Sequence, residues 1–382
     1  MFLAAVFLVF QLPEEVSFDE AISVAGKMGK LEVVNFNFDL SERYNFWSGI
    51  IASVFLFLSY FGTDQSQVQR YLSGKSLTES RLGLLFNGIL KVPMQFLVLF
   101  VGILVFVFFQ FTKPPVHFNE GNVTSLQGTK YEVLYEEMNE AHTAVFEDKQ
   151  VVMRELVGAI RAEDEAAIST AQSRMDELIS QDKVIQDSVK TLIKQNNSAA
   201  KVEDTDYVFI TFITQYMPIG LVGIILAVIF SAAMSSTASE LNALATTSVI
   251  DIYRRSFVKN KNDYHYLKAS KWLTIAWGVL TLIFATWADL FDNLIEFVNI
   301  VGSLFYGTIL GIFLVAFFMK KVGGTAVFYA AILAEIIVIS VFALNEWDYI
   351  NITYLWLNPI GCIPVMVFSA LFQPFVGKSV SQ

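Results

Sequence analysis

Seven long apolar runs restrict this chain more than any other feature of its sequence. Each holds at most one charged side chain, and they lie at 46–62, 94–112, 218–240, 272–288, 297–319, 325–344 and 352–374. A bilayer core of ~30 Å takes roughly 20 apolar residues to cross as a helix. With 54% hydrophobic residues and 35 Phe, the composition exceeds what a water-soluble core needs. The sequence predicts an all-α polytopic membrane protein.

The distribution of Lys and Arg predicts the orientation of these spans. Basic residues gather in the loops 63–93, 250–271 and 320–324 and in the C-terminal tail. The alternate short loops hold only Lys27, Lys30 and Arg43. Because short cytoplasmic loops retain Lys and Arg preferentially, the first full span is expected to run inward. We therefore expect a multi-pass protein of the plasma membrane with a cytoplasmic C-terminus and with residues 113–206 extracellular or periplasmic.

The segment 113–206 differs in kind from the rest of the chain. Between 114 and 206 there are 18 acidic and 9 basic residues, so this insert accounts for nearly all of the net charge of −10. From about 130 to 195 its apolar residues recur at helical spacing, as at Val145, Val152 and Leu156. We predict an acidic helical hairpin outside the membrane. A solvated lid is the favoured interpretation of it, and a surface that docks a partner or gathers substrate is the alternative.

The first residues resemble the end of a transmembrane helix. The stretch MFLAAVFLVFQLP offers 12 residues before Pro13, or ~18 Å of helix, which is too short to cross a bilayer. A signal peptide would need a basic first segment and a small-residue cleavage site, and neither is evident. We interpret 1–12 as the end of a truncated helix of a longer transporter. A chain of this kind is expected to show no sodium-driven uptake when it is reconstituted by itself.

A row of small polar residues ends the apolar run that starts at Pro218. On a helix, one face collects Ala232, Ser235, Ser236, Ser239, Asn242 and Thr246, whereas Thr237 points the other way. Hydroxyl and carbonyl oxygens are hard ligands that suit a desolvated cation such as Na⁺. Small residues also line ordinary seams between membrane helices, because they let backbones approach. The spacing alone leaves both interpretations open, with packing slightly favoured.

Three segments carry a resemblance to a known family. They are AAMSSTASELNALATTSVIDIY, the earlier FGTDQSQVQRYLSGKSLTESRLGLLFNGILKVPMQF and the later FVNIVGSLFYGTILGIFLVAFFMKK. Together they resemble the sodium:solute symporter family, which includes the sodium–glucose cotransporters. The resemblance covers nearly all of the chain except the insert. The QVQRY run is nearer to the branch that moves monocarboxylates, vitamins and inorganic anions.

The resemblance implies a leucine-transporter-type inverted repeat, with ligands bound near the midplane between broken helices. It divides the chain into the end of a truncated helix (1–12), an extracellular loop (13–45), the first two helices of repeat two (46–112), the insert (113–206), the last three core helices (207–319) and two peripheral helices with a short tail (320–382). Gly302, Gly307 and Gly311 are expected to be helix contacts or a kink rather than ligands.

Candidate ligand residues follow from the family's sodium site, which uses two adjacent hydroxyl residues and a carbonyl one turn earlier. The matching positions are Ser235, Ser236 and Ala232, with Ser239 and Asn242 as possible neighbours. The other half of that site lies on a helix of repeat one. Na⁺ is thus the expected metal, as the coupling ion, and no cofactor is expected.

Substrate residues carry over less completely. The gating Tyr of the sugar carriers matches Tyr60, but their sugar-binding Asn corresponds to Phe57, which puts sugar recognition in doubt. A Gln of their last core helix corresponds to Asn299, one turn after Glu296. We predict that these four residues lie near the substrate; hydrogen bonding between helices is the alternative role for Tyr60 and Asn299.

The function that these features predict is sodium-coupled symport of a small organic or anionic solute by alternating access. The partners expected are that solute, Na⁺ and the lipid bilayer, with no nucleic acid. The sequence offers no catalytic constellation, since its three histidines lie in loops, so an enzyme is not expected. A membrane sensor built on the same transporter fold is the alternative.

Overall fold

The computed structural model describes residues 2–13, 16–31, 34–288 and 294–376, and all of its regular elements are helices. Six helices are long and apolar enough to cross a membrane: Leu77–Phe111, Ile219–Phe257, Asp263–Thr286, Phe297–Phe318, Gly324–Glu346 and Tyr354–Val376. The seventh expected span, 46–62, is the shorter apolar helix Ser48–Thr63. The all-α polytopic class is confirmed.

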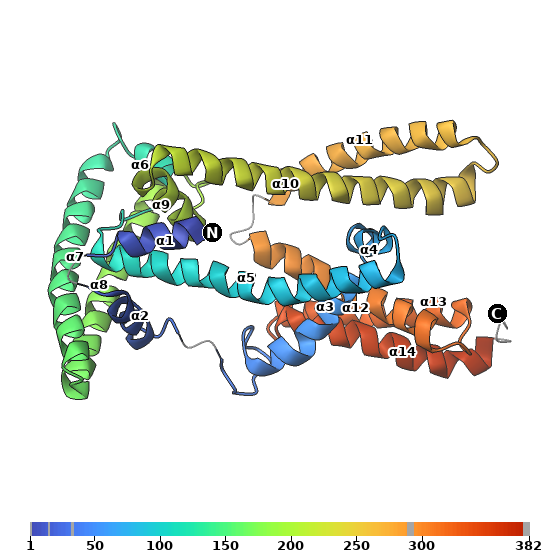
Figure 1. The fold of residues 1–382 in the computed structure, drawn as a ribbon, viewed down its shortest axis with the longest axis horizontal. Helices are drawn as coiled ribbons and strands as arrows, with labels where there is room; N and C mark the ends of the chain where they lie inside the picture. Colours follow the sequence, from blue (N-terminus) through green and yellow to red (C-terminus); the bar gives the residue numbers. More distant parts are fainter. Residues whose placement is uncertain (1, 14–15, 32–33, 289–293, 377–382) are drawn as a thin grey trace. The chain divides into compact units, whose positions relative to one another are not determined.

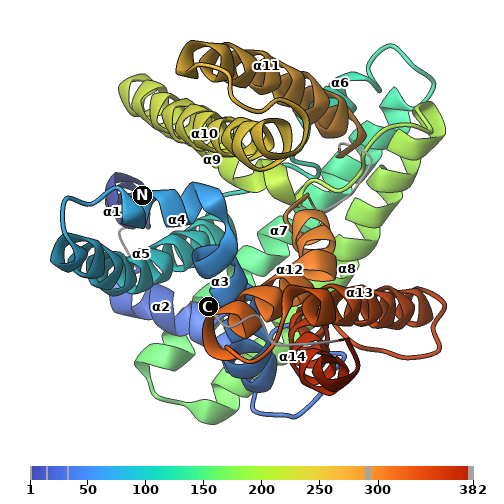
Figure 2. The ribbon, with the colours of Figure 1, turned by 90° about the vertical axis from the view of Figure 1, so that its right-hand side faces the viewer.

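The described chain separates into two compact units (Figures 1 and 2). The first comprises residues 1–33 and 86–230. Its helices are α1 (Phe2–Phe10), α2 (Phe18–Lys27), the second part of α5 (Leu77–Phe111), α6 (Glu120–Thr124), α7 (Glu132–Arg161), α8 (Glu165–Asn196), the short 3₁₀ turn η2 (Thr205–Tyr207), α9 (Val208–Tyr216) and the first part of α10 (Ile219–Thr247).

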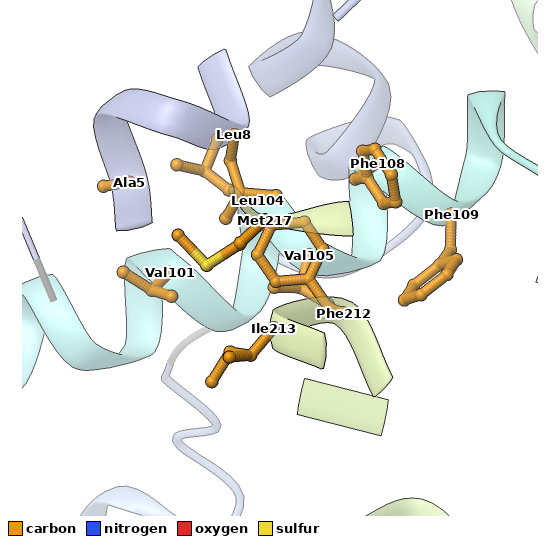
Figure 3. Close-up of a cluster of buried hydrophobic side chains, with 10 residues drawn as sticks. All are labelled: Ala5, Leu8, Val101, Leu104, Val105, Phe108, Phe109, Phe212, Ile213 and Met217. Carbon is orange, nitrogen blue, oxygen red and sulfur yellow. The ribbon is translucent and has the colours of Figure 1, made fainter. Parts of the chain in front are cut away.

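An aromatic core holds α1, α5 and α9 together in this unit (Figure 3). Phe108 of α5 packs edge-on against Phe212 of α9 with ring centroids 5.2 Å apart, and Leu8 of α1 is 1% exposed beside them. Burying a side chain of this size contributes about 1.5–3 kcal/mol. The nine residues of α1 are therefore anchored by packing on α5.

The hairpin expected between 130 and 195 is present as α7 and α8. A turn of three residues joins them, in which Glu163 takes a positive φ of 53° and the Asp164 side chain caps α8 by accepting from the amides of Ala166 and Ala167. Buried residues at helical spacing, such as Leu156 on α7 and Met175 on α8, pack together with Val24 of α2. The apolar periodicity of the sequence thus forms the seam of the hairpin.

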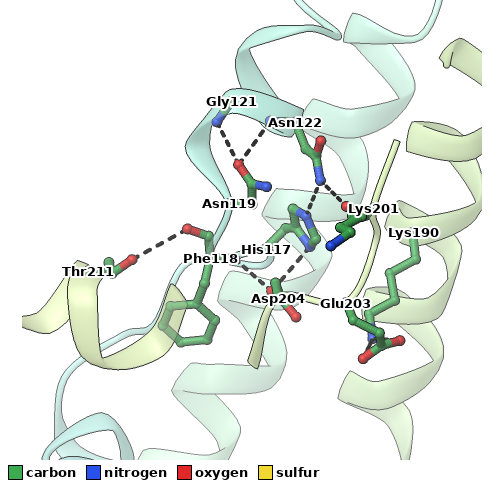
Figure 4. Close-up of polar contacts among 10 residues, drawn as sticks. All are labelled: His117, Phe118, Asn119, Gly121, Asn122, Lys190, Lys201, Glu203, Asp204 and Thr211. Carbon is green, nitrogen blue, oxygen red and sulfur yellow. Dashed lines mark hydrogen bonds and ion pairs between the residues drawn. The ribbon is translucent and has the colours of Figure 1, made fainter. Parts of the chain in front are cut away.

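Two buried histidine–aspartate pairs hold the base of the hairpin. His142 Nδ1 lies 2.5 Å from Asp182 Oδ1, and Lys149 Nζ lies 2.6 Å from the other oxygen of this carboxylate. His117 Nδ1 lies 3.1 Å from Asp204 Oδ2, which also accepts from the Phe118 amide at 2.7 Å (Figure 4). Burial would raise the pKa of both aspartates, but these donors outweigh it and lower each pKa below its usual value.

The second unit comprises residues 34–85 and 231–382. Its helices are the π-helical turn η1 (Ser48–Ala52), α3 (Ser53–Thr63), α4 (Gln65–Leu72), the first part of α5, the second part of α10, the π-helical segment η3 (Ser248–Phe257), α11 (Asp263–Ala288), α12 (Leu294–Phe318), α13 (Gly324–Glu346), the 3₁₀ turn η4 (Tyr354–Trp356) and α14 (Leu357–Val376).

Glycines allow α12 and α14 to pack backbone against backbone. A Cβ atom at Gly307 would lie 2.2 Å from the Asn358 carbonyl oxygen, and one at Gly311 would lie 2.8 Å from that of Cys362. Both positions are therefore helix contacts, as the sequence predicted. A Cβ at Gly302 would instead meet the Tyr306 ring of its own helix at 2.6 Å.

Candidate sodium and substrate site

The polar face of α10 arises because its apolar run changes to small hydroxyl residues within one continuous helix. Between Ile219 and Thr247 the helix carries one charged side chain, Glu240, and it continues as η3. Ala232, Ser235 and Ser236 are all exposed. Asn242 is exposed as well, whereas Ser239 is half-buried.

The hydroxyls on the two sides of α10 are engaged differently. Thr237 donates to the Ala233 carbonyl of its own helix at 2.9 Å, so its hydroxyl is already satisfied. Ser235 and Ser236 make no side-chain hydrogen bond within the part of the chain that the structure describes. Two adjacent hydroxyls with unoccupied lone pairs fit a hard cation, which needs oxygen ligands to replace its hydration shell. They supply part of such a ligand set.

A break between α3 and α4 brings further polar groups to the same unit. Asp64 has extended backbone angles (φ −70°, ψ 121°), which end α3. Its carboxylate caps α4 by accepting from the amides of Ser66 at 2.7 Å and Gln67 at 3.4 Å. The break explains why the first expected span is short. The family resemblance implied broken helices around the ligands but did not place one at this position.

Three side-chain contacts join α4 to the polar half of α10. Ser66 Oγ lies 2.6 Å from Glu240 Oε1, and Arg70 Nη2 donates to Ser239 Oγ at 3.2 Å. Thr247 donates to the side-chain oxygen of Gln65. Ser239, a candidate neighbour of the sodium site, therefore accepts a hydrogen bond from α4.

The hydroxyl of Ser66 lies between two carboxyl groups. It is 2.6 Å from Asp64 Oδ1 and 2.6 Å from Glu240 Oε1, and it also accepts from Gln67 Nε2 at 3.3 Å. A hydroxyl has a single proton to donate, so it can satisfy only one ionised carboxylate. At any moment the hydroxyl donates to either Asp64 or Glu240. Ser66 is 2% exposed, so water has little access to this hydroxyl and its hydrogen bonds are made within the protein.

Of the candidate substrate residues, two lie on α3. Tyr60 is half-buried, and its hydroxyl accepts from Gln67 Nε2 at 2.8 Å. Phe57 is 54% exposed, and its ring centroid lies 6.4 Å from that of Phe61. Tyr60 is thus tied through Gln67 to the group that joins α4 and α10.

The other two candidates belong to α12, which packs against α3 where Ser59 Oγ donates to the Tyr306 carbonyl at 2.9 Å. Asn299 is half-buried on α12. No hydrogen bond joins Asn299 to Tyr60 among the described residues. The side chain of Glu296 lies outside the described part of the chain.

Sequence reasoning missed Glu240, Ser66 and Arg70 as candidates. One carboxylate in an otherwise apolar membrane helix is itself a signal of function. Glu240 could have been selected on that ground, because it lies one turn beyond Ser236. Ser66 and Arg70 offered no comparable signal in a segment rich in polar residues.

Comparison with known proteins connects these helices to one family. Residues 189–334, which include the polar face of α10 and all of α12, match the model of the sodium:solute symporter family. This part of the chain resembles the sodium:solute symporters. The resemblance indicated by the sequence motifs is therefore confirmed.

Several curated symporters share parts of the chain. The sodium/sialic acid symporter of Proteus mirabilis is 28% identical over 165 residues, which are 43% of this chain and 32% of that protein. The sodium/glucose cotransporter of Vibrio parahaemolyticus is 21% identical over 264 residues, 69% of this chain and 35% of its own length. The human sodium-coupled monocarboxylate transporter 1 is 44% identical over 59 residues, 15% of this chain and 10% of its own length. The chain thus spans about a third of the first two relatives, and less of the third.

A solved structure gives the same result for the fold. A sodium-coupled sialic acid symporter in a substrate-bound outward-open state matches with a TM-score of 0.63 and 17% identity, over 99% of this chain and 60% of that one. At this identity the match speaks for the fold alone. It confirms the transporter-type architecture expected from the sequence.

Proposed function

We propose that this chain takes part in sodium-coupled symport of a small organic or anionic solute across the plasma membrane by alternating access. The observation that carries the proposal is the exposed pair Ser235 and Ser236, whose hydroxyls make no hydrogen bond within the described chain. The symporter relatives support it, since each is described as sodium-coupled. With the carbonyl of Ala232, the pair supplies hard oxygens for Na⁺.

In the proposed cycle, sodium binds the α10 oxygens and stabilises the outward-open arrangement, and solute then enters the central cavity. The membrane supplies about 2.3 kcal/mol per charge per 100 mV for inward movement. Sodium leaves into the cytoplasm, and the loss of its contacts favours the inward-open arrangement. The coupling requires only that each ligand prefer one arrangement. Tyr60, Phe57, Glu296 and Asn299 are the residues proposed to face the solute.

The orientation that the Lys and Arg distribution favours belongs to the same proposal. The C-terminus is then cytoplasmic and the hairpin α7–α8 is on the outside. On this side the hairpin acts as an external lid, since the insert carries 18 acidic and 9 basic residues between 114 and 206, a pattern typical of a solvated surface.

Uptake by cells with the natural gene intact or deleted tests the proposal. The solutes are sialic acid, glucose, short monocarboxylates and vitamins, each offered with an inward sodium gradient. We expect deletion to remove sodium-driven uptake of at least one solute, and replacement of sodium by choline to have the same effect. Equal uptake of every solute with and without the gene would refute the proposal.

A further inference from the structure

The first unit contains a cavity that the proposed transport cycle does not use. It has a volume of about 790 Å³ and lies where α2, the end of α5 and the hairpin α7–α8 meet. Ligand sites in proteins commonly enclose about 300–1,000 Å³. The cavity is therefore large enough for a ligand of the size of a lipid head group and the start of its acyl chains.

One wall of the cavity is apolar and belongs to a membrane span. Gly102 and Phe106 of α5 line it. One turn before Gly102 on the same side of the helix, Leu99 is 55% exposed. The apolar wall is thus continuous with an exposed apolar face of a helix that is long enough to cross the bilayer.

The opposite wall is ionic. Polar residues of α8 line the cavity at helical spacing from Gln172 to Lys190, a length of about 27 Å of helix. Some of the lining charges are already paired, such as Lys149 with Asp182 and Lys190 with Glu203.

Four other lining charges, Lys30, Lys183, Asp176 and Asp187, form no ion pair within the described residues. Lys30 lies over the Phe106 ring at 4.8 Å, which places a cation at the apolar wall. Two cations and two anions without partners form a surface that is complementary to a zwitterion.

The direction of the hairpin places this cavity at the edge of the membrane. Figures 1 and 2 show α7 and α8 running across the C-terminal end of α5 rather than along it. Gln150 of α7 donates to the Gln110 carbonyl at that end. Because α5 ends at Phe111, insertion of α5 in a bilayer would place α8 at the level of the head groups.

We propose that the cavity binds a phospholipid with a zwitterionic, amine-bearing head group. Lys30 and Lys183 contact its phosphate, and Asp176 and Asp187 contact its ammonium group. Its acyl chains follow the groove at Gly102 toward Leu99. The site depends on insertion of α5 in a bilayer and not on sodium or solute transport.

The experiment uses the full chain in vesicles that contain a trace of spin-labelled phosphatidylethanolamine, phosphatidylcholine or phosphatidylglycerol. Electron paramagnetic resonance then measures how strongly each lipid associates with the protein. We expect phosphatidylethanolamine to associate about fivefold more strongly than phosphatidylglycerol, which has no ammonium group to form the two ion pairs with aspartate. It should also exceed phosphatidylcholine, because a quaternary ammonium has no N–H to donate to these carboxylates. Equal association of the three lipids, or a preference for phosphatidylglycerol, would overturn the proposal.

Two pairs of variants locate the site. The double variant Lys30→Gln/Lys183→Gln should abolish the preference, whereas Lys194→Gln, an exposed α8 residue outside the cavity, should retain it. Gly102→Leu should fill part of the groove, and its Cβ has room because no atom lies within 4 Å of it. A Cβ at Gly88, elsewhere on α5, has the same room, which makes Gly88→Leu the control. Circular dichroism confirms that each variant is folded. Retention of the preference in folded Gly102→Leu would exclude this cavity as the site.

Discussion

Glu240 Oε1 lies 2.6 Å from Ser66 Oγ, so the polar half of α10 is bound to the first turn of α4. Asp64 Oδ1 lies at the same distance from the same hydroxyl. The helix with the candidate sodium ligands and the broken helix with the candidate gating Tyr60 therefore share one buried hydrogen-bonding group. If α10 moves relative to the broken helix, the hydrogen bonds at Ser66 must either move with it or break.

Replacement of Glu240 tests how much its contact with Ser66 contributes to stability. Glu240→Gln should preserve the contact, because a side-chain amide can donate to Ser66 Oγ while Ser66 donates to Asp64. Glu240→Ala should lower the free energy of unfolding by about 1–2 kcal/mol through the lost hydrogen bond. Thermal unfolding of both variants in detergent measures this. Equal losses in the two variants would mean that an amide at position 240 does not replace this contact.

Replacement of Ser236 tests the sodium site in cells that carry the natural gene. Ser236→Ala should raise the half-maximal sodium concentration for uptake roughly 5- to 150-fold, by analogy with hydrogen bonds to charged groups worth about 1–3 kcal/mol. Thr237→Ala is the control, because its hydroxyl bonds back to Ala233 and should shift that concentration little. If both changes have the same effect at matched expression, the polar face of α10 is a packing seam.

The buried aspartates predict how the hairpin responds to pH. Asp182 and Asp204 have pKa values below normal because hydrogen bonds from histidine, lysine and backbone donors outweigh burial. Their stabilising contribution is complete above the unfolded-state pKa of about 3.9 and is lost as pH falls through the lower folded-state values. Amide hydrogen exchange over 113–206 should therefore accelerate below about pH 4.

Asp182→Asn is the variant that isolates this effect. It should weaken the hairpin at neutral pH and reduce the further loss on acidification, because one of the two titrating groups is gone. Exchange in residues 324–346, on α13, serves as the internal reference. If hydrogen exchange in the hairpin of Asp182→Asn depends on pH as it does in the unchanged protein, this carboxylate does not have the role predicted for it.

Gly307 predicts a steric effect in the second unit. Gly307→Ala would place a methyl group 2.2 Å from the Asn358 carbonyl oxygen, so α14 would have to move. We expect a loss of about 1–3 kcal/mol in the free energy of unfolding, as is usual for overpacking. Gly62→Ala on α3 is the control, since a Cβ there has open space. Chemical denaturation of both variants in micelles compares them, and an unaffected Gly307→Ala would show that the helices can separate without cost.

The predicted topology can be tested by labelling Ser198→Cys. Ser198 is exposed, and the native Cys362 is 0% exposed, so a membrane-impermeant thiol reagent should modify the introduced residue alone. We expect labelling of intact cells without permeabilisation. Labelling that appears only after permeabilisation would reverse the orientation of every loop.

Local signals explain what the sequence could predict. The spans were found because each is a long apolar run, and the hairpin because Val152 and Leu156 repeat at helical spacing. The bond between Ser66 and Glu240 joins positions 174 residues apart, and neither residue stands in a pattern that specifies the other. The lipid-sized cavity depends on the direction of α8 across α5, which no periodicity encodes. Contacts between residues far apart in the sequence, and the directions in which the helices run, thus had to come from the structure.

The close approach of α12 and α14 has a mechanical consequence. Where a Cβ added to a glycine of one helix would lie 2.2 Å from a carbonyl oxygen of the other, as at Gly307 and Asn358, no side chain lies between the two backbones to yield or rotate. Two helices packed in this way are expected to tilt together as one rigid unit. If α12 changes its tilt during transport, we expect α14 to change its tilt with it. A helix that the family resemblance assigns to the periphery would then displace the surrounding lipid.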